Sequence, residues 1–234
     1  MHLKPAGLMG VVIAFTAMLF AAAAFGDTGE KILTSRCVEC HELKGPGPAS
    51  LAELRALKGP NLSYAGNKYK QAWLAQWLKA PTRIRPAGMY YGNHIKPGEE
   101  HDVVDEAGLI THVALGDADA KAVAAALMQH KAKSELLTPG VYQPGTISLS
   151  MGEMIFDKFR GCLACHQIEP GYGGVSGPEI YTVGSRLQED YIISFIQNPQ
   201  AWSPLTFMPR RTLKDKDLQK LVHYFRALAK EKFE

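Results

Sequence analysis

The chain contains one sequence pattern twice, and this repeat limits the possible folds more than any other feature. Residues 37–41 read CVECH and residues 162–166 read CLACH, and each is followed by a Gly-Pro pair, at 59–60 and at 177–178. Further along, Trp73, Trp77, Pro81 and Pro86 match Tyr191, Phe195, Pro199 and Pro204 at a constant spacing. A repeat of this length in a chain of 234 residues indicates two similar domains of about 100 residues each.

Each copy of the pattern ends in a segment with the apolar period of a helix. The first segment follows Asp117 and the second follows Asp215, and apolar residues three and four apart place each set on one helical face. These residues are Ala120, Val123, Ala124, Leu127 and Met128 in the first segment, and Leu218, Leu221, Val222, Phe225 and Leu228 in the second. An aspartate at the start of each segment is typical of a helix N-cap.

Both halves are predicted to be all-α. Each has a helix that leads into the cysteine pair, a loop rich in proline and glycine, a middle helix ended by proline, and a final helix, and no run of useful length has the period of a strand. We place the first domain at residues 27–137, with an insertion at 90–114. A linker with two Pro-Gly pairs follows at 138–148, and the second domain occupies 149–234.

The first 26 residues have the features of an export signal. Lys4 precedes an uncharged apolar stretch over residues 8–25, which ends in small residues. The stretch is long for a signal peptide and just long enough to span a membrane, so it is either a cleaved signal or an N-terminal membrane anchor. Both alternatives place the rest of the chain in the periplasm, free or anchored to the inner membrane. The net charge of +3 is too small to indicate a nucleic-acid partner.

All four cysteines belong to the two C-x-x-C-H motifs, which are the attachment signature of c-type haem. Two thiols three residues apart can each form a thioether to a haem vinyl group, and the adjacent histidine is then held under the iron. A zinc site would need a fourth ligand for each Cys₂His set, and a thioredoxin-like pair would need a βαβ pattern. We therefore predict two covalently bound haem c groups, attached at Cys37, Cys40, Cys162 and Cys165, with His41 and His166 as iron ligands.

Methionines after the two middle helices are candidates for the sixth iron ligand. Met208 lies in a loop between Pro204 and Pro209, just ahead of the final helix, and Met89 lies in the equivalent loop of the first half. Met89 is one residue closer to its proline than Met208, and the flexible Gly88 could absorb the difference. His94 is the competing ligand. The Gly-Pro pairs at 59–60 and 177–178 offer carbonyls that could hold the second nitrogen of each proximal histidine, although they could equally form only turns.

Two charged regions flank these loops. The insertion contains three histidines among carboxylates, and we expect a solvated loop or short hairpin that covers the first haem and helps in docking; a metal site is the alternative. These residues are His94, Glu99, Glu100, His101, Asp102, Asp105, Glu106 and His112. Basic residues follow Met208, namely Arg210, Arg211, Lys214, Lys216 and Lys220, and are either a docking face or an ordinary solvated helix start. We hypothesise that the acidic and basic regions serve different partners at the two ends of the molecule.

Each half resembles a class I cytochrome c domain, and the pair resembles periplasmic di-haem cytochromes c and the di-haem subunits of respiratory complexes. The resemblance rests on the two C-x-x-C-H motifs, the loop methionines and the repeated helices, and it covers residues 27–234. It implies two tandem three-helix domains, each wrapped around a covalently bound haem, with His/Met ligation and electron transfer at the haem edge. The shifted Met89 and the insertion at 90–114 depart from the family pattern.

Ligation of both axial positions leaves no open site on the iron, which favours an electron carrier over an enzyme. The expected partners are redox proteins that donate and accept electrons, and the carrier is either a diffusing shuttle or a subunit of a membrane quinol-oxidising complex. Membrane contact would come through the N-terminal segment. The alternative function is a di-haem redox enzyme, peroxidase-like or thiosulfate-oxidising. Such an enzyme needs a vacant or unusual sixth position, and the chain has no fifth cysteine to provide one.

Overall fold

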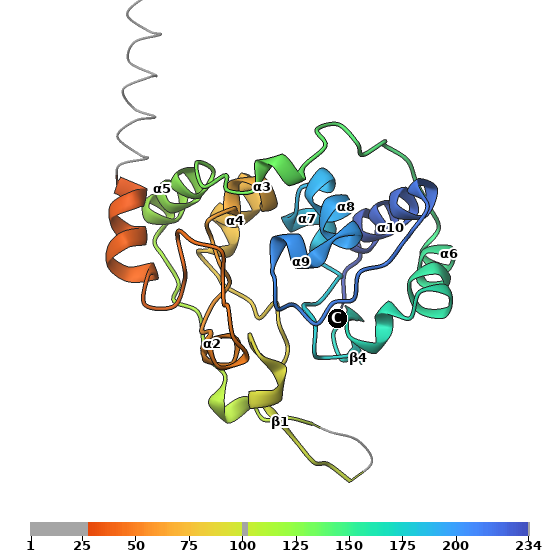
Figure 1. Cartoon of the computed structure of the whole chain (residues 1–234), viewed down its shortest axis with the longest axis horizontal. Helices are drawn as coiled ribbons and strands as arrows, with labels where there is room; N and C mark the ends of the chain where they lie inside the picture. The colour runs from red at the N-terminus through yellow and green to blue at the C-terminus, as the bar shows by residue number, and fades with distance from the viewer. Residues whose placement is uncertain (1–27, 100–102, 234) are drawn as a thin grey trace, which may run out of the picture.

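A computed structural model describes residues 28–99 and 103–233, which form two helical lobes (Figure 1). The segment linking the lobes crosses along one edge of the molecule, and a hairpin projects from the other edge. The predicted signal or anchor at residues 1–26 lies outside the described residues. Within the described part of the chain, no helix has the length and apolar character needed to cross a membrane.

The first lobe begins with an α-helix over residues 28–32 that continues as the π-helix η1, Leu33–Cys37. Its other helices are α2 (Leu51–Ala56), α3 (Ala65–Lys68), α4 (Gln71–Trp77) and α5 (Asp117–Leu127), with 3₁₀ turns η2 (Tyr91–Asn93), η3 (Glu106–Gly108) and η4 (Ser134–Leu136). Strands β1 (Ile95–Lys96) and β2 (Val103–Val104) pair antiparallel within the insertion.

The second lobe follows the same plan. Its helices are α6 (Leu149–Met154), the π-helix η5 (Ile155–Phe159), the 3₁₀ turn η6 (Cys162–Ala164), α7 (Val183–Arg186), α8 (Glu189–Gln197), α9 (Pro199–Trp202) and α10 (Asp215–Leu228). Strands β3 (Gln167–Glu169) and β4 (Tyr172–Gly173) pair antiparallel directly after the cysteine motif. The predicted helix before each cysteine pair, middle helix and final helix are therefore present in both lobes.

The final helices bury the faces that the sequence predicts. All five apolar residues predicted for α10 are buried, and so are four of the five predicted for α5; Met128, which follows the last residue of α5, is partly buried. The predicted N-caps are wrong. Asp117 and Asp215 are the first helical residues, and Gly116 and Lys214 occupy the cap positions without a side-chain cap bond. An aspartate in the first turn still stabilises the helix through its favourable interaction with the helix dipole.

A glycine marks the point where the first helix of each lobe contacts the last. A Cβ atom added to Gly29 would lie 2.0 Å from the carbonyl oxygen of Ala122 in α5. A Cβ added to Gly152 would lie 2.2 Å from the Tyr224 ring in α10. Neither distance is possible for a real side chain, so only glycine allows these helices to approach so closely.

The lobes are rich in helix but are not all-α as predicted. The four strands are only two or three residues long, too short to give a period-two apolar pattern in the sequence. Tight turns create them instead: Gly171 adopts a φ of 80° between β3 and β4. The hairpin expected for the insertion is confirmed by β1 and β2.

The two lobes exchange backbone hydrogen bonds at positions that are equivalent in the repeat. The N–H of Lys70 donates to the carbonyl of Arg186, and the N–H of Gln188 donates to the carbonyl of Lys68, both at 2.9 Å. Lys70 corresponds to Gln188, and Lys68 to Arg186, in the two copies of the sequence pattern. At this interface the two lobes are therefore related to each other by an approximate twofold rotation.

Side chains and a shared apolar core strengthen this interface. Lys70 Nζ lies 2.8 Å from Glu189 Oε1 in an ion pair that crosses between the lobes. The Tyr64 ring of the first lobe packs against Tyr191 and Trp202 of the second, with ring centres 6.3 and 5.3 Å apart. Such contacts fix the orientation of one lobe relative to the other.

Candidate haem-binding sites

Both cysteine motifs form a single helical turn that brings the two thiols to one side. The amide N–H of Cys40 donates to Cys37 O, and that of Cys165 donates to Cys162 O, both at 3.1 Å. All four thiols are free. Residues three apart on a helical turn lie on the same face, so each pair can react with one flat group that carries two vinyl substituents.

The first thiol of each motif lacks the character of a reactive redox cysteine. Burial raises the pKa of the Cys37 thiol and of the Cys162 thiol above the ordinary value. Catalytic and disulfide-exchanging cysteines instead have a lowered pKa, because the thiolate is the nucleophile. The local environment thus supports the prediction that these motifs are not thioredoxin-like.

Each motif histidine is oriented by the carbonyl of a proline in the following loop. The Nδ1 atom of His41 lies 2.9 Å from Pro60 O, and the Nδ1 atom of His166 lies 2.7 Å from Pro178 O. A proton on Nδ1 satisfies each bond and leaves the lone pair on Nε2 free for a metal. The carbonyls of the two Gly-Pro pairs, which the sequence suggested for this role, are therefore correctly placed.

Burial also keeps these imidazoles in the neutral form that binds metals. It is the main cause that lowers the pKa of His166 to about 4, and it lowers the pKa of His41 as well. The hydrogen bonds to Pro178 and Pro60 oppose this effect only in part. At neutral pH both rings are uncharged and able to donate electrons from Nε2.

A glycine packs directly against each of these rings. A Cβ added to Gly59 would lie 2.5 Å from His41 Cε1, and one added to Gly177 would lie 2.6 Å from His166 Cε1. Only a residue without a side chain leaves space for the histidine in this position. The free thiol pair, the oriented imidazole and the glycine cradle together fit a covalently bound haem in each lobe.

We expect Gly177→Ala to disturb the second site selectively. The added methyl group would displace the His166 ring and lengthen its bond to Pro178. The low-spin absorption spectrum of one haem should change and its reduction potential should shift, while the other haem keeps both values. Gly140→Ala is a control for the effect of adding a methyl group at a glycine, because a Cβ at Gly140 meets nothing within 4 Å, although its φ of 73° carries a strain of its own. An unchanged spectrum and potential in Gly177→Ala would contradict the role assigned to this glycine.

In the second lobe, the loop between α9 and α10 carries Met208. The side chain is half-buried and packs against the hydrophobic core. Gln200 Nε2 donates to the Met208 carbonyl at 2.8 Å, which ties the loop to α9. This anchored position agrees with the predicted role of Met208 as an iron ligand, which stays a prediction.

In the first lobe, Met89 follows a glycine that has the special conformation anticipated from the sequence. Gly88 has a φ of 74°, in the left-handed region. The His94 ring packs against this glycine, since a Cβ on Gly88 would lie 2.9 Å from His94 Cδ2. A Cβ on Gly108 would lie 3.2 Å from His94 Nδ1, so His94 is held between two glycines at the base of the insertion. Met89 as an iron ligand also stays a prediction.

The placement of His112 could not be predicted from the sequence. His112 is one of the histidines in the charged insertion, and its ring lies beside that of His41, with ring centres 6.0 Å apart. Among the described residues, no group of three or more His, Cys, Asp or Glu could hold a metal ion, and residues 100–102 lie outside that description. The ring contact with His41 places His112 at the first haem site.

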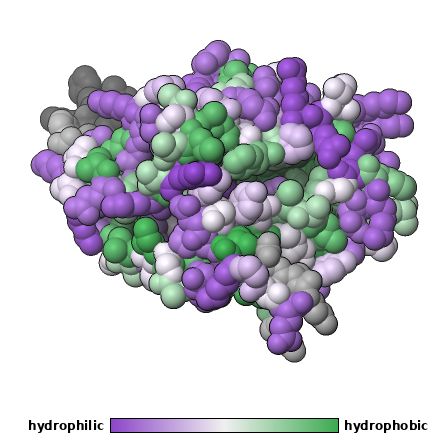
Figure 2. Space-filling model, turned by 60° about the horizontal axis from the view of Figure 1, so that its bottom comes forward, coloured by the Kyte–Doolittle hydropathy of each residue, from purple (hydrophilic) through white to green (hydrophobic). Residues whose placement is uncertain are grey.

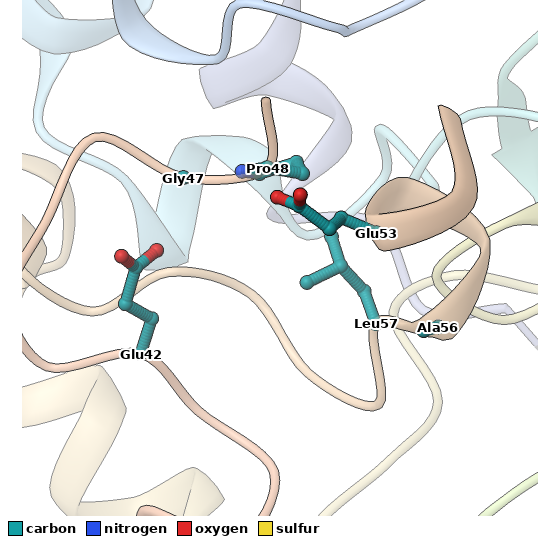
Figure 3. A pocket seen from close by; sticks show the side chains of 6 residues that line it. All are labelled: Glu42, Gly47, Pro48, Glu53, Ala56 and Leu57. Atoms are coloured by element: carbon teal, nitrogen blue, oxygen red, sulfur yellow. The ribbon is translucent and has the colours of Figure 1, made fainter. Parts of the chain in front are cut away.

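A shallow pocket lies in the loop after the first cysteine motif (Figure 3). Glu42 and Glu53 line it together with Gly47, Pro48, Ala56 and Leu57. Both carboxylates are used within the loop: Glu42 Oε2 accepts from Asn61 Nδ2 at 2.6 Å, and Glu53 Oε2 accepts from Ala49 N at 2.9 Å. These bonds close the loop that ends in the Pro60 carbonyl beneath His41.

The basic residues after Met208 are exposed and begin close to the second cysteine motif. Arg211 lies near enough to Cys162 to lower the pKa of its thiol in part. Phe207, beside Met208, is 61% exposed, and its ring centre lies 6.0 Å from those of Tyr90 and Tyr91 at the start of the insertion. The start of the insertion and the start of the basic loop thus lie side by side, and the hypothesis that the acidic and basic regions serve different partners stays a prediction. On the face in Figure 2, apolar groups are interspersed with polar ones.

A lobe with a C-x-x-C-H turn, an imidazole oriented by a carbonyl and a glycine cradle defines a c-type cytochrome domain. Comparison with protein families agrees for both lobes. Residues 26–131 match the family model Cytochrome c, and residues 148–225 match the model of cytochrome c oxidase, cbb3-type, subunit III. The chain is a cytochrome c with two c-type domains. No curated protein and no solved structure matches it.

Proposed function

We propose that this protein is an exported di-haem cytochrome c that relays single electrons between two redox proteins. It acts as a shuttle or as a subunit of a membrane respiratory complex. The observation that carries the proposal is the duplicated site: each lobe holds a free thiol pair and a carbonyl-oriented histidine, and both lobes share one apolar core. Haem bound at such a site supplies a reversible one-electron change at its iron.

The protein residues have clear tasks in this proposal. Cys37, Cys40, Cys162 and Cys165 attach the two haems. His41 and His166 would bind the irons, and Pro60 and Pro178 hold those rings in place. Met208 completes the second site. For the first site the sequence predicts Met89, and the structure places a second candidate, His112, beside His41.

The interface between the lobes suits electron transfer between the two haem sites of one molecule. The reciprocal backbone bonds of Lys70 and Gln188, and the aromatic contacts of Tyr64, hold the two sites in one arrangement. A fixed arrangement gives a fixed distance between the sites and avoids reorientation at each transfer. The match of the second domain to a respiratory oxidase subunit supports a place in a respiratory chain.

The exposed basic loop is the proposed contact surface for an acidic partner. Arg210 and Arg211 are exposed, and Arg211 lies near the Cys162 thiol that would carry the haem. Attraction between opposite charges speeds the encounter of two proteins and is weakened by salt.

The proposed function is tested by electron transfer from the reduced protein. Transfer to a small acidic redox protein should be fast and should slow as salt increases, whereas turnover with peroxide or thiosulfate should be negligible. Arg210→Gln with Arg211→Gln should reduce the rate at low salt by about tenfold and flatten the salt dependence. Lys230→Gln with Lys232→Gln removes the same charge beyond the far end of α10 and should have little effect. Sustained catalysis with either substrate would support the enzyme alternative.

A further inference from the structure

His112 lies in the segment that leads from the insertion into α5. Its side chain is half-buried, whereas the next side chain, Val113, is 58% exposed. The segment is fixed beside the end of α4, because the N–H of Leu115 donates to the Leu78 carbonyl at 2.8 Å. The His112 ring also packs on Trp77, with ring centres 4.7 Å apart. These contacts turn the imidazole inward from an otherwise exposed segment.

The distance from His112 to His41 is the separation expected for two imidazoles on one metal ion. A bond from a metal to an imidazole nitrogen is about 2 Å long, and the ring centre lies about 1.1 Å beyond the nitrogen, so two rings on opposite sides of a metal have centres roughly 6.2 Å apart. The centres of His41 and His112 are 6.0 Å apart, with ring planes at 54°. Rings on opposite sides of a metal can adopt any such angle, since each turns freely about its own bond.

His112 is also prepared as a ligand in the same way as His41. Its Nδ1 atom lies 2.8 Å from the carbonyl oxygen of Val113, so a proton on Nδ1 is satisfied there. The Nε2 lone pair is then free, as it is in His41, whose Nδ1 is bound to Pro60. Two imidazoles with occupied Nδ1 atoms lie beside each other at the first haem site.

His112 and Met208 both lie in the segment directly ahead of the final helix of their lobe. His112 precedes the first residue of α5 by five positions, and Met208 precedes the first residue of α10 by seven. Met89, in contrast, lies before the insertion. The insertion therefore separates Met89 from α5 in the sequence, and His112 lies in the segment ahead of α5 instead.

His94, the competitor suggested by the sequence, has a different task. Its ring is held between the backbones of Gly88 and Gly108, and the N–H of Asp105 donates to its carbonyl at 2.7 Å. These contacts anchor the insertion on the loop that carries Met89. His94 thus supports the local fold.

We propose that His112 is the second axial ligand at the first haem site, which then has two imidazoles, while the second site has His166 and Met208. This inference rests on the proposed function, because it requires a haem at both cysteine motifs. A thioether ligand raises the reduction potential relative to a second imidazole. The first domain therefore has the lower potential, and electrons pass favourably from the first domain to the second.

Spectra of the oxidised two-haem protein test the assignment directly. A thioether bound to ferric haem gives a far-red charge-transfer band that a second imidazole does not. We expect the wild-type band to have the intensity of one haem per chain, to vanish in Met208→Ala and to be unchanged in Met89→Leu. Redox titration should show two separate steps. The proposal would be overturned if the wild-type band had the intensity of two haems per chain and Met89→Leu halved it.

Variants of His112 provide a second measurement. His112→Ala should convert one haem to the high-spin form, and added imidazole should restore the low-spin spectrum. His112→Met should double the far-red band and bring the two potentials closer together. His94→Ala is the matched control and should leave the number of low-spin haems unchanged; conversion of one haem to high spin in His94→Ala alone would assign the ligand to His94. The haem content is measured separately by mass. Two haems per chain without the expected ligand would contradict the assignment of His112 alone, whereas no haem at the first motif would contradict the proposed function.

Discussion

Replacing Cys162 and Cys165 by alanine leaves a protein with one covalent haem instead of two. The thioether bonds need both thiols, and no other cysteine lies in the second domain to replace them. We expect the mass of the variant to be lower than that of the wild-type protein by one haem. After extraction with acidic acetone, the variant should retain half as much haem as the wild-type protein. Cys37→Ala with Cys40→Ala is the matched variant and should remove the other haem. Non-covalent haem in the wild-type protein, or zinc in its place, would contradict the assignment of both sites.

Loss of the haem should also destabilise the domain that held it. Small domains built around a metal group depend on that group for much of their folding free energy. In the second lobe, Phe156 packs on both His166 and Phe225 of α10, so the first and last helices meet at the site. We expect the double variant to lose helical signal in far-ultraviolet circular dichroism, with the first haem still attached.

The helices and their buried faces could be predicted because they depend on residues that are close together in the sequence. Apolar residues three and four apart determine the buried faces of α5 and α10 wherever those helices pack. The C-x-x-C-H turns and the Gly-Pro carbonyls could also be predicted, since the chemistry needs these groups at short and fixed spacing. The repeat confirmed each feature by showing it twice.

Features that depend on distant contacts could not be predicted. The reciprocal bonds of Lys70 and Gln188 lie at equivalent positions in the repeat, but the sequence gives no sign that the two copies face each other there. The placement of His112 depends on the path of a long insertion, which the sequence leaves open. The contact of Tyr90 with Phe207, which brings the start of the insertion to the second lobe, likewise has no local signal in the sequence.

The repeat also hides a difference between the two sites. Asn61 and Glu179 both follow the Gly-Pro pair, and both organise the loop, but with different chemistry. Asn61 is a neutral residue whose side chain donates to Glu42 and Gly45. Glu179 is a buried acid, only 2% exposed, next to the proline whose carbonyl holds His166. A charge of this kind is stable only when it is paired.

The partner of Glu179 is Arg186, which is 3% exposed. Glu179 Oε1 lies 3.4 Å from Arg186 Nε, and Arg186 Nη2 donates to the Glu179 carbonyl at 2.6 Å. The N–H of Thr182 donates to Glu179 Oε2 at 2.8 Å, and its hydroxyl donates to Oε1. The backbone of Glu179 also reaches the first lobe, donating to the Ile84 carbonyl at 2.8 Å. The carboxylate of Glu179 therefore joins the His166 loop to α7, and its backbone N–H joins that loop to the first lobe.

Glu179→Ala is therefore expected to destabilise the protein by about 3–5 kcal/mol, because it leaves the Arg186 guanidinium buried without its counter-charge. Denaturant unfolding, followed by haem absorbance, measures this loss. Asn61→Ala is the matched control at the equivalent position and should cost about 1 kcal/mol, since it removes only hydrogen bonds of a neutral amide. Glu179→Leu combined with Arg186→Met should recover most of the loss, because apolar side chains can replace a buried ion pair at little cost. If Glu179→Ala proved no more harmful than Asn61→Ala, the buried pair would have no special part in holding the His166 loop.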